Sequence, residues 1–353
     1  MNNLIEENNI QTIVDVFGEH GITINYLCTE QGPTITRYTF YPEENIKISS
    51  IRRKADKIAA DFSVDKVRII TPVEGIPIIW VEIPNRKRAF VSFESFLPAL
   101  EKSNYRLPVV LGVTNDEYHY SDSDVLIDLA DAPNVLIGGD DSSGKSMLVR
   151  SIICSLIHRK SPGELKLILA QTLKTDMSCY EGCEYLLRPV SYTAEEVFQA
   201  LEYLAEEIEN RIDLFAKVKA RKIELYNKTA EEKMPYIVCV IDEVAGAVEA
   251  DSKRFDTLIK RVTSVGKFCG IHLVLTTDYP SAYTISATVR SNMHTYIAMA
   301  VSNQIKSRLI IENPGAEMLL GKGDMLYLEG FDFKQPTRIQ GAYVDDSWLK
   351  KSH

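Results

Sequence analysis

Residues 139–146 read Gly-Asp-Asp-Ser-Ser-Gly-Lys-Ser and match the phosphate-binding pattern G-x-x-x-x-G-K-[ST] at every fixed position. The two glycines let the backbone turn tightly and aim successive N–H groups at phosphate oxygens. The lysine can reach the β- and γ-phosphates of a nucleotide, and the last serine hydroxyl can bind Mg²⁺. The stretch predicts a nucleotide site made of Gly139, Asp140, Asp141, Ser142, Ser143, Gly144, Lys145 and Ser146.

The residues on either side of this stretch have the pattern that a phosphate-binding loop requires. Residues 134–138 (Asn-Val-Leu-Ile-Gly) read as a short apolar strand, and residues 147–158 have the apolar spacing of a helix. Glycine, serine and aspartate are also common turn residues, so a chance loop is the alternative. A strand that enters the loop and a helix that leaves it favour the phosphate site.

A second motif, at residues 236–243, reads Tyr-Ile-Val-Cys-Val-Ile-Asp-Glu, an apolar strand that ends in two carboxylates. In P-loop ATPases the first carboxylate, here Asp242, holds Mg²⁺, and the second, here Glu243, orients or deprotonates the attacking water. A buried strand that ends in a charged turn is the alternative. The position of the motif after a phosphate-binding loop favours the role in ATP hydrolysis. Thr276 and Thr277 end the next strand, where they either sense the γ-phosphate or reflect strand propensity alone.

The composition is that of a globular protein of more than one domain, with 353 residues, 45% of them apolar. No apolar run is long enough to cross a bilayer, and the N-terminal residues lack an export signal. The six cysteines read as reduced thiols, so we expect a cytoplasmic location, with recruitment to a membrane by a partner left open. The net charge of −9 argues against a surface that is basic all over but leaves nucleic acid open as a partner.

Strands and helices alternate from residue 125 to about 344, which predicts an α/β domain whose mostly parallel sheet has helices on both faces. The strand candidates are 135–137, 165–170, 236–241, 271–276 and 295–300, and the helix candidates are 145–159, 194–225 and 251–268. A small α+β module precedes this domain. The predicted domains are an N-terminal helix and linker at 1–31, the α+β domain at 32–115, the ATPase domain at 116–345 and a tail at 346–353.

With these parts in place, the chain resembles the motor region of the FtsK/SpoIIIE family of bacterial DNA translocases from about residue 32 to 346. Besides the two motifs, the resemblance rests on Gly32–Arg37, Ile83–Arg88, Ile127–Pro133, Ser178–Gly182, Leu186–Val190, Gly270–Leu275, Ser307-Arg308, Gly315–Met325 and Arg338–Val344. It implies a small "alpha" domain, a RecA-like P-loop domain that uses ATP and Mg²⁺, and a homo-oligomer, a hexameric ring around double-stranded DNA.

The resemblance also suggests roles for several basic residues. Arg211 falls where the family has a Glu-Arg-Arg helix, and it or Arg308 would reach the ATP of a neighbouring subunit; ordinary solvated or paired arginines are the alternative. The candidates for binding DNA phosphates are Arg290, Lys260, Arg261 and Lys267, which would otherwise be ordinary surface charge.

The chain departs from the family pattern at three places near the expected site. The usual Asp-Pro-Lys is Gln171-Thr172-Leu173, followed by Lys174, and the usual Gln-Arg-Pro is Asp278-Tyr279-Pro280. Tyr296 stands where an arginine is common. The sequence also ends nine residues after Val344, without the family's membrane-spanning region or its winged-helix "gamma" domain. We expect a shortened mobile-element or accessory homologue, or a cut piece of a longer chain.

The sequence thus predicts an ATP-driven translocase motor that acts on double-stranded DNA. One alternative is a coupling ATPase of conjugation or secretion that moves a protein or a relaxosome. The other is a nucleotide-binding scaffold with little turnover, which the aspartate at 278 and the glutamine at 171 motivate. The partners would be DNA, further copies of the chain and a membrane-protein or mobile-element partner, with no direct membrane insertion.

Overall fold

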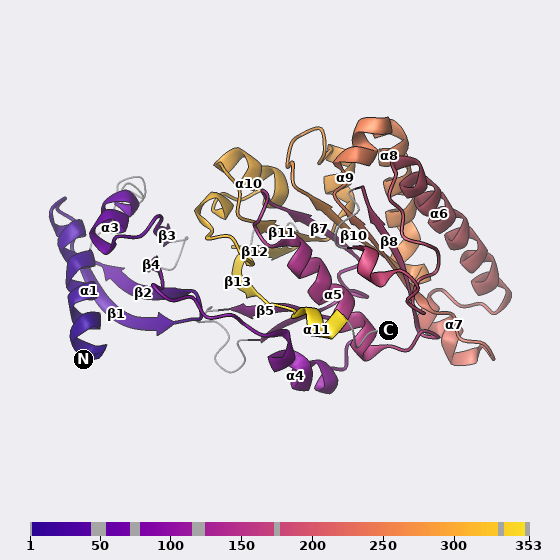
Figure 1. Ribbon diagram of the computed structural model, residues 1–353, viewed down its shortest axis with the longest axis horizontal. Helices are drawn as coiled ribbons and strands as arrows, with labels where there is room; N and C mark the ends of the chain where they lie inside the picture. The colour runs from indigo at the N-terminus through magenta and orange to yellow at the C-terminus, as the bar shows by residue number, and fades with distance from the viewer. Residues whose placement is uncertain are drawn as a thin grey trace. The chain divides into compact units, whose positions relative to one another are not determined.

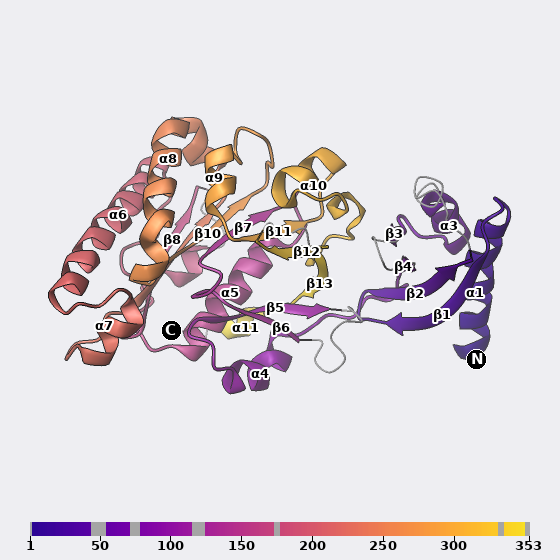
Figure 2. The same ribbon diagram turned by 180° about the vertical axis from the view of Figure 1, so that it is seen from behind.

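The computed structural model describes residues 2–43, 54–70, 78–114, 124–172, 177–330 and 335–349. These residues form two compact units, Met1–Phe90 and Val91–His353 (Figures 1 and 2). Among the described residues, no helix is both long and apolar enough to cross a membrane.

The smaller unit is an antiparallel sheet covered by helices. Its strand order is β1-β2-β4-β3. The helices α1 and α3 pack against each other and share a core with the sheet, in which Phe17, Phe40, Ile58 and Val81 are fully buried or nearly so. The elements are α1 (Asn2–Gly18), β1 (Ile24–Gln31), β2 (Ile35–Pro42), α3 (Ala55–Phe62), β3 (Arg68–Ile70) and β4 (Ile79–Pro84). Residues 2–31 therefore contain a helix and an edge strand of this unit, where the sequence predicted a helix and a linker.

The larger unit is built on a nine-stranded sheet with the order β6-β5-β13-β12-β11-β7-β10-β9-β8. The strands are β5 (Pro108–Thr114), β6 (Asp124–Asp128), β7 (Asn134–Gly138), β8 (Leu165–Gln171), β9 (Tyr236–Asp242), β10 (Ile271–Thr277), β11 (Thr295–Met299), β12 (Asp324–Glu329) and β13 (Thr337–Gly341). The five strands from β11 to β8 are parallel, and the other four pair antiparallel. The sheet is thus mixed, and its parallel strands are in the majority, as predicted.

Helices cover both faces of the large sheet, as predicted. Side chains of a strand alternate between its two faces, and in β7 Leu136 joins one core while Val135 and Ile137 join the other. The first core is closed by α6 (Ala194–Lys217), α8 (Ala245–Val265), α9 (Ala287–Asn292) and α10 (Gln304–Ile311), and the second by α5 (Lys145–Arg159). The short helices are α4 (Leu97–Lys102), α7 (Ile223–Thr229) and α11 (Asp346–Leu349).

Local sequence explains where the long helices begin and break. A capping box starts α6, because the Thr193 hydroxyl accepts from the Glu196 N–H while the Glu196 carboxylate accepts from the N–H of Thr193. The predicted helix 194–225 breaks where Lys219 adopts a left-handed φ of 55°. The predicted helix 251–268 begins earlier, at Ala245, and has a non-helical residue at Asp251.

The division between the units differs from the predicted domain boundary at residues 115 and 116, which lie outside the described residues. Strand β5 pairs with β6 and β13 and so belongs to the large sheet. The start of the predicted tail is also folded into this unit, because the Trp348 ring packs edge-on against Phe93, 5.3 Å between centroids. Residues 350–353 are not among those described.

Candidate nucleotide site

The predicted phosphate-binding loop connects β7 to α5, and neighbouring segments fix its shape. The N–H of Gly139 donates at 3.2 Å to the carbonyl of Thr277, the last residue of β10, and the Ser143 carbonyl accepts from the N–H of Gly323 at 2.8 Å. Gly144 has a φ of 113°, and a Cβ there would lie 2.4 Å from the Gly323 nitrogen. The second glycine of the motif is therefore required by backbone conformation and by close packing.

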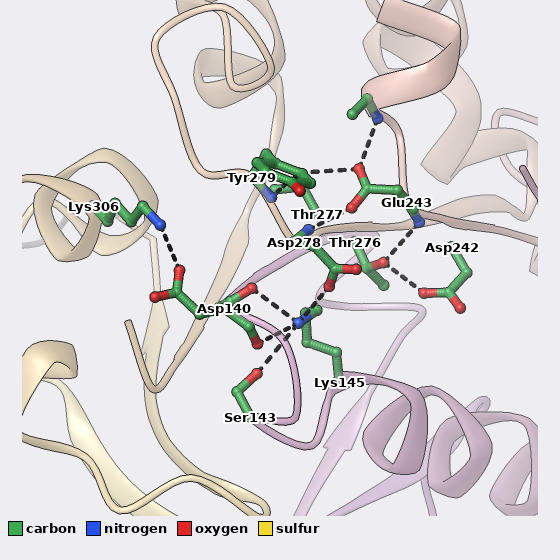
Figure 3. Close-up of polar contacts among 12 residues, drawn as sticks. Asp140, Ser143, Lys145, Asp242, Glu243, Thr276, Thr277, Asp278, Tyr279 and Lys306 are labelled. Atoms are coloured by element: carbon green, nitrogen blue, oxygen red, sulfur yellow. Dashed lines mark hydrogen bonds and ion pairs between the residues drawn. The ribbon is translucent and has the colours of Figure 1, made fainter. Parts of the chain in front are cut away.

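The side chain of Lys145 is buried and turned back into the loop (Figure 3). Its Nζ donates to the carbonyl oxygens of Gly139 at 2.9 Å and Asp140 at 2.8 Å, and to Ser143 Oγ at 3.3 Å. It also forms an ion pair with Asp278 Oδ1 at 2.5 Å. Asp278 stands where the family pattern has glutamine, so one of the departures contacts the lysine that is predicted to bind phosphate.

The remaining loop residues are more open to solvent. Asp140 is half-buried and pairs through Oδ1 with Lys306 of α10 at 2.6 Å. Asp141, Ser142 and Ser146 are exposed. The loop therefore presents an open side, next to the first turn of α5, from which a phosphate could enter.

Asp242 ends β9 and is held by side chains from both neighbouring strands. Its Oδ1 accepts from Thr276 Oγ1 at 2.6 Å, and its Oδ2 accepts from Gln171 Nε2 at 2.9 Å. Gln171 is itself fixed, because its Oε1 accepts from the Met177 N–H at 3.1 Å. The glutamine that departs from the family pattern thus orients the proposed Mg²⁺ ligand. Leu173 and Lys174, which follow it, lie outside the described residues.

The carboxylate of Glu243 is also held by hydrogen bonds. Its Oε1 accepts from the Ala245 N–H at 2.8 Å and from Thr277 Oγ1 at 3.2 Å, and its Oε2 accepts from the Asp278 N–H at 2.6 Å. The Glu243 N–H donates to Thr276 Oγ1 at 2.9 Å. Burial raises the pKa of Glu243 above its ordinary value, and the backbone donors oppose this rise.

Thr276 and Thr277 therefore hold the two carboxylates. The sequence offered γ-phosphate sensing or strand propensity for these residues and did not predict this contact. This contact could have been predicted from the parallel pairing of β8, β9 and β10, because such pairing brings the ends of adjacent strands to one edge of the sheet.

The oxygen donors at this edge fit a magnesium ion. Mg²⁺ is bound in proteins by one or two carboxylate or hydroxyl oxygens, with phosphates and water completing its six ligands. The carboxylate of Asp242 and the exposed hydroxyl of Ser146 are donors of this type. Among the described residues, no group of three or more His, Cys, Asp or Glu could hold a metal by itself.

The proposed trans role of Arg211 is wrong for this structure. The residue is only 2% exposed. Its guanidinium donates to Glu207 Oε1 at 2.8 Å and to the carbonyls of Pro235 at 2.9 Å and Cys269 at 2.8 Å. A buried side chain that is held by three hydrogen bonds inside the fold cannot reach the nucleotide of another molecule, so Arg211 is structural.

Arg308 differs, because it is exposed on α10, the helix that also carries Lys306. The four candidate DNA-binding residues differ in their exposure and in their contacts. Arg290 is half-buried and pairs with Glu312 at 3.7 Å, and exposed Arg261 pairs with Glu209. Lys260 is exposed, and exposed Lys267 lies over the Phe268 ring, 5.1 Å from its centroid.

Comparison with known proteins follows the same division of the chain. The FtsK/SpoIIIE family profile matches residues 100–282, and the FtsK alpha domain profile matches residues 2–85. The curated relatives include DNA translocase FtsK of Treponema pallidum (strain Nichols), 36% identical over 96% of this chain and 42% of its own length. DNA translocase SftA of Bacillus subtilis (strain 168) is 36% identical over 92% of this chain and 34% of its own length. The chain thus spans less than half the length of these relatives.

Solved structures of similar fold include the pCW3 conjugation coupling protein TcpA in a monomer form with ATPγS. It is 19% identical with a TM-score of 0.63, covering 96% of this chain and 97% of TcpA. The cytoplasmic domain of the Thermomonospora curvata type VII secretion ATPase EccC has a TM-score of 0.63 and 19% identity, covering 73% of this chain and 32% of its own. The FtsK/SpoIIIE family profile matches more than half of the length of this chain, and the chain therefore belongs to the FtsK/SpoIIIE family.

Proposed function

We propose that the chain is an ATP-dependent motor that moves double-stranded DNA. The observation that carries this proposal is the placement of Lys145, Asp242 and Glu243 at the carboxyl edge of the parallel strands β7, β10 and β9, with both carboxylates held by hydrogen bonds. Relatives named DNA translocase, at 36% identity across almost the whole chain, support DNA as the cargo.

Each residue of the site has a distinct part in hydrolysis. The loop N–H groups and Lys145 bind the β- and γ-phosphates, and Ser146 and Asp242 would hold Mg²⁺, which neutralises charge on the phosphates. Glu243 orients the attacking water and accepts its proton. The hydrogen bonds from Thr276 and Gln171 keep Asp242 in one orientation, so little reorganisation accompanies metal binding.

The proposal extends to the partners of the motor. We propose a ring of identical subunits, a hexamer, in which exposed Arg308 reaches the nucleotide of a neighbour and makes hydrolysis depend on assembly. DNA would be held through its phosphates by basic side chains, among them Lys260 and Lys267, so binding should be sensitive to salt and tolerant of sequence. A cytoplasmic location with recruitment by a membrane or mobile-element partner completes the proposal.

The test is ATP hydrolysis by the purified chain with and without duplex DNA. DNA should stimulate the wild-type rate, and Lys145→Ala and Glu243→Gln should each lower it by about 10² or more, because both residues act on the reacting phosphate or water. Exposed residues of α8 give the matched controls Lys253→Ala and Glu249→Gln, which should keep the wild-type rate. Full DNA-stimulated activity in Lys145→Ala or Glu243→Gln would overturn the proposal.

Two observations favour other functions. TcpA, a conjugation coupling protein, matches the fold over nearly its whole length, which supports a coupling ATPase that acts on a protein or relaxosome. The aspartate at 278 and the glutamine at 171, which depart from the family pattern, support a nucleotide-binding scaffold with little turnover. Stimulation by a partner protein but not by DNA would favour the first, and tight ATP binding with negligible hydrolysis at every DNA concentration would favour the second.

A further inference from the structure

The ammonium group of Lys145 already has acceptors inside the protein for all of its N–H donors. A lysine ammonium has three N–H donors, and four oxygen atoms lie within 3.3 Å of this one. Three of them belong to the loop itself, from Gly139, Asp140 and Ser143. The fourth is the carboxylate of Asp278, which comes from the segment after β10 (Figure 3).

A nucleotide phosphate that binds Lys145 must compete with one of these oxygens. The three loop oxygens are neutral and covalently tied to the lysine's own turn. The Asp278 carboxylate carries the same sign of charge as a phosphate and sits 2.5 Å from Nζ, so both anions cannot share the lysine without repulsion. Asp278 is therefore the group that a phosphate displaces.

Asp278 is also joined to Glu243 through its backbone. Its N–H donates to Glu243 Oε2 at 2.6 Å, and the preceding residue, Thr277, donates from Oγ1 to Glu243 Oε1 at 3.2 Å. The segment is anchored further on, where the Thr284 hydroxyl donates to the carbonyl of Tyr279. One short segment thus holds the phosphate-binding lysine by its side chain and the water-orienting glutamate by its backbone.

We propose that the Asp278 carboxylate competes with the nucleotide phosphates for Lys145 and thereby weakens ATP binding. Because Asp278 belongs to the segment that positions Glu243, the binding of a phosphate at Lys145 is also coupled to this segment. This inference deepens the proposed function and depends on it, because it takes residues 139–146 to be the phosphate site. It assigns Asp278 as the residue that sets nucleotide affinity.

The test is the dissociation constant for ATP of the full chain, measured by calorimetry in Asp278→Asn. Asparagine keeps the shape and the backbone N–H but removes the charge, so ATP should bind about tenfold more tightly, the effect of losing one charge-assisted competitor. AMP lacks the β- and γ-phosphates that Lys145 would hold, so its affinity should change by less than about threefold. Asp278→Ala, which lacks the polar side chain, should also tighten ATP binding.

The control for general charge effects is Asp213→Asn, on α6 and outside the proposed site. Asp213 is exposed and forms no ion pair with a described residue, so its charge is screened and ATP affinity should change by less than about threefold. Hydrolysis gives a second readout, since Asp278→Asn should lower KM for ATP while kcat is retained, because the backbone contact to Glu243 remains.

The outcomes separate this inference from the proposed function. If Lys145→Ala binds ATP as well as wild type, the proposed site is wrong. If Lys145→Ala loses ATP while Asp278→Asn binds ATP equally or more weakly than wild type, the site stands and Asp278 is not a competitor. Thermal unfolding of each variant, with a midpoint near that of wild type, excludes misfolding as the cause.

Discussion

Glu243 has a strained backbone at the point where chemistry is proposed. Its φ is 64°, a left-handed conformation that non-glycine residues seldom adopt, and its carboxylate accepts three hydrogen bonds. Strain of this kind persists only where surrounding contacts enforce it, and it is concentrated at functional sites. Here the contacts from Ala245, Thr277 and Asp278 enforce it.

The raised pKa of Glu243 predicts the pH dependence of hydrolysis. The residue must be ionised to accept a proton from water, and burial raises its pKa above the ordinary value for glutamate, so activity should begin to fall at a higher pH than for an exposed glutamate. The nearby charge of Asp278 also raises this pKa, and Asp278→Asn should therefore move the acid limb of kcat to lower pH. Circular dichroism over the same range checks folding, and an unchanged limb in Asp278→Asn would contradict the prediction.

Arg211 should contribute to stability rather than to hydrolysis. Arg211→Met leaves the carbonyls of Pro235 and Cys269 and the Glu207 carboxylate without this donor, so urea denaturation should show a loss of about 3 kcal/mol. The exposed Arg308→Met should change stability by less than about 0.5 kcal/mol but lower the DNA-stimulated ATPase rate. Equal effects of both variants on stability would contradict this assignment.

His272 makes the large unit sensitive to acid. The ring is fully buried in β10 and stacks on Tyr236 with centroids 6.0 Å apart. Burial lowers the pKa of His272 to about 3, from its ordinary value of 6.5. A histidine with a depressed folded pKa stabilises the fold above its unfolded pKa, and this stability is lost as the pH falls from 6.5 toward 3.

His272→Phe removes this titration while it keeps an aromatic ring in place. Between pH 7 and about pH 5, the free energy of unfolding of wild type should fall by about 2 kcal/mol more than that of the variant. Chemical denaturation of both proteins at the two pH values measures this difference. Parallel losses in both proteins would show that His272 does not titrate on unfolding in this range.

The antiparallel half of the sheet supports the phosphate-binding loop. The segment before β12 lies against the loop, with the Gly323 N–H bonded to the Ser143 carbonyl at 2.8 Å. The segment is fixed in turn by Asp324, whose Oδ2 accepts from the Leu320 N–H at 2.8 Å and from Arg338 Nη2 at 2.6 Å. The antiparallel strands thus stabilise a site that they do not themselves supply with catalytic groups.

Gly144→Ala tests this contact. The added Cβ would lie 2.4 Å from the Gly323 nitrogen at a φ of 113°, so the loop must change shape, and ATP binding should weaken by about 10² or more. Gly163→Ala is the matched control, because a Cβ there has nothing within 4 Å. Calorimetry measures ATP affinity, and circular dichroism should show a retained fold in both variants. Normal ATP affinity in Gly144→Ala would show that the loop tolerates the change.

For the molecule as a whole, the division into two units predicts independent folding. Each unit has its own hydrophobic core, one around α1 and β2 and the others around the nine-stranded sheet. Residues 91–353 contain every residue proposed to bind the nucleotide. Expressed alone, they should unfold cooperatively and bind ATP within about threefold of the full chain. Loss of cooperative unfolding or of ATP binding would show that the larger unit needs the smaller one.

The sequence by itself determined the parts of this protein that depend on local patterns. These parts are the loop at 139–146, the strand that ends in Asp242 and Glu243, and the alternation of parallel strands with helices. Each is visible in residues that are close together in the sequence. A phosphate-binding loop needs only its own glycines and the following helix, and buried strands are recognisable as apolar runs. The placement of α5 and of the five parallel strands was therefore predictable.

Only the tertiary structure decided which distant residues meet. Strand register brings Gln171 and Thr276 to Asp242, although these residues are far apart in the chain. Packing also buries Arg211 and brings the Asp278 carboxylate to the Lys145 ammonium group, and neither result follows from residue type or spacing. The physical reason is that hydrogen bonds and ion pairs depend on separations of a few ångströms, which the packing of the whole sheet and its helices sets.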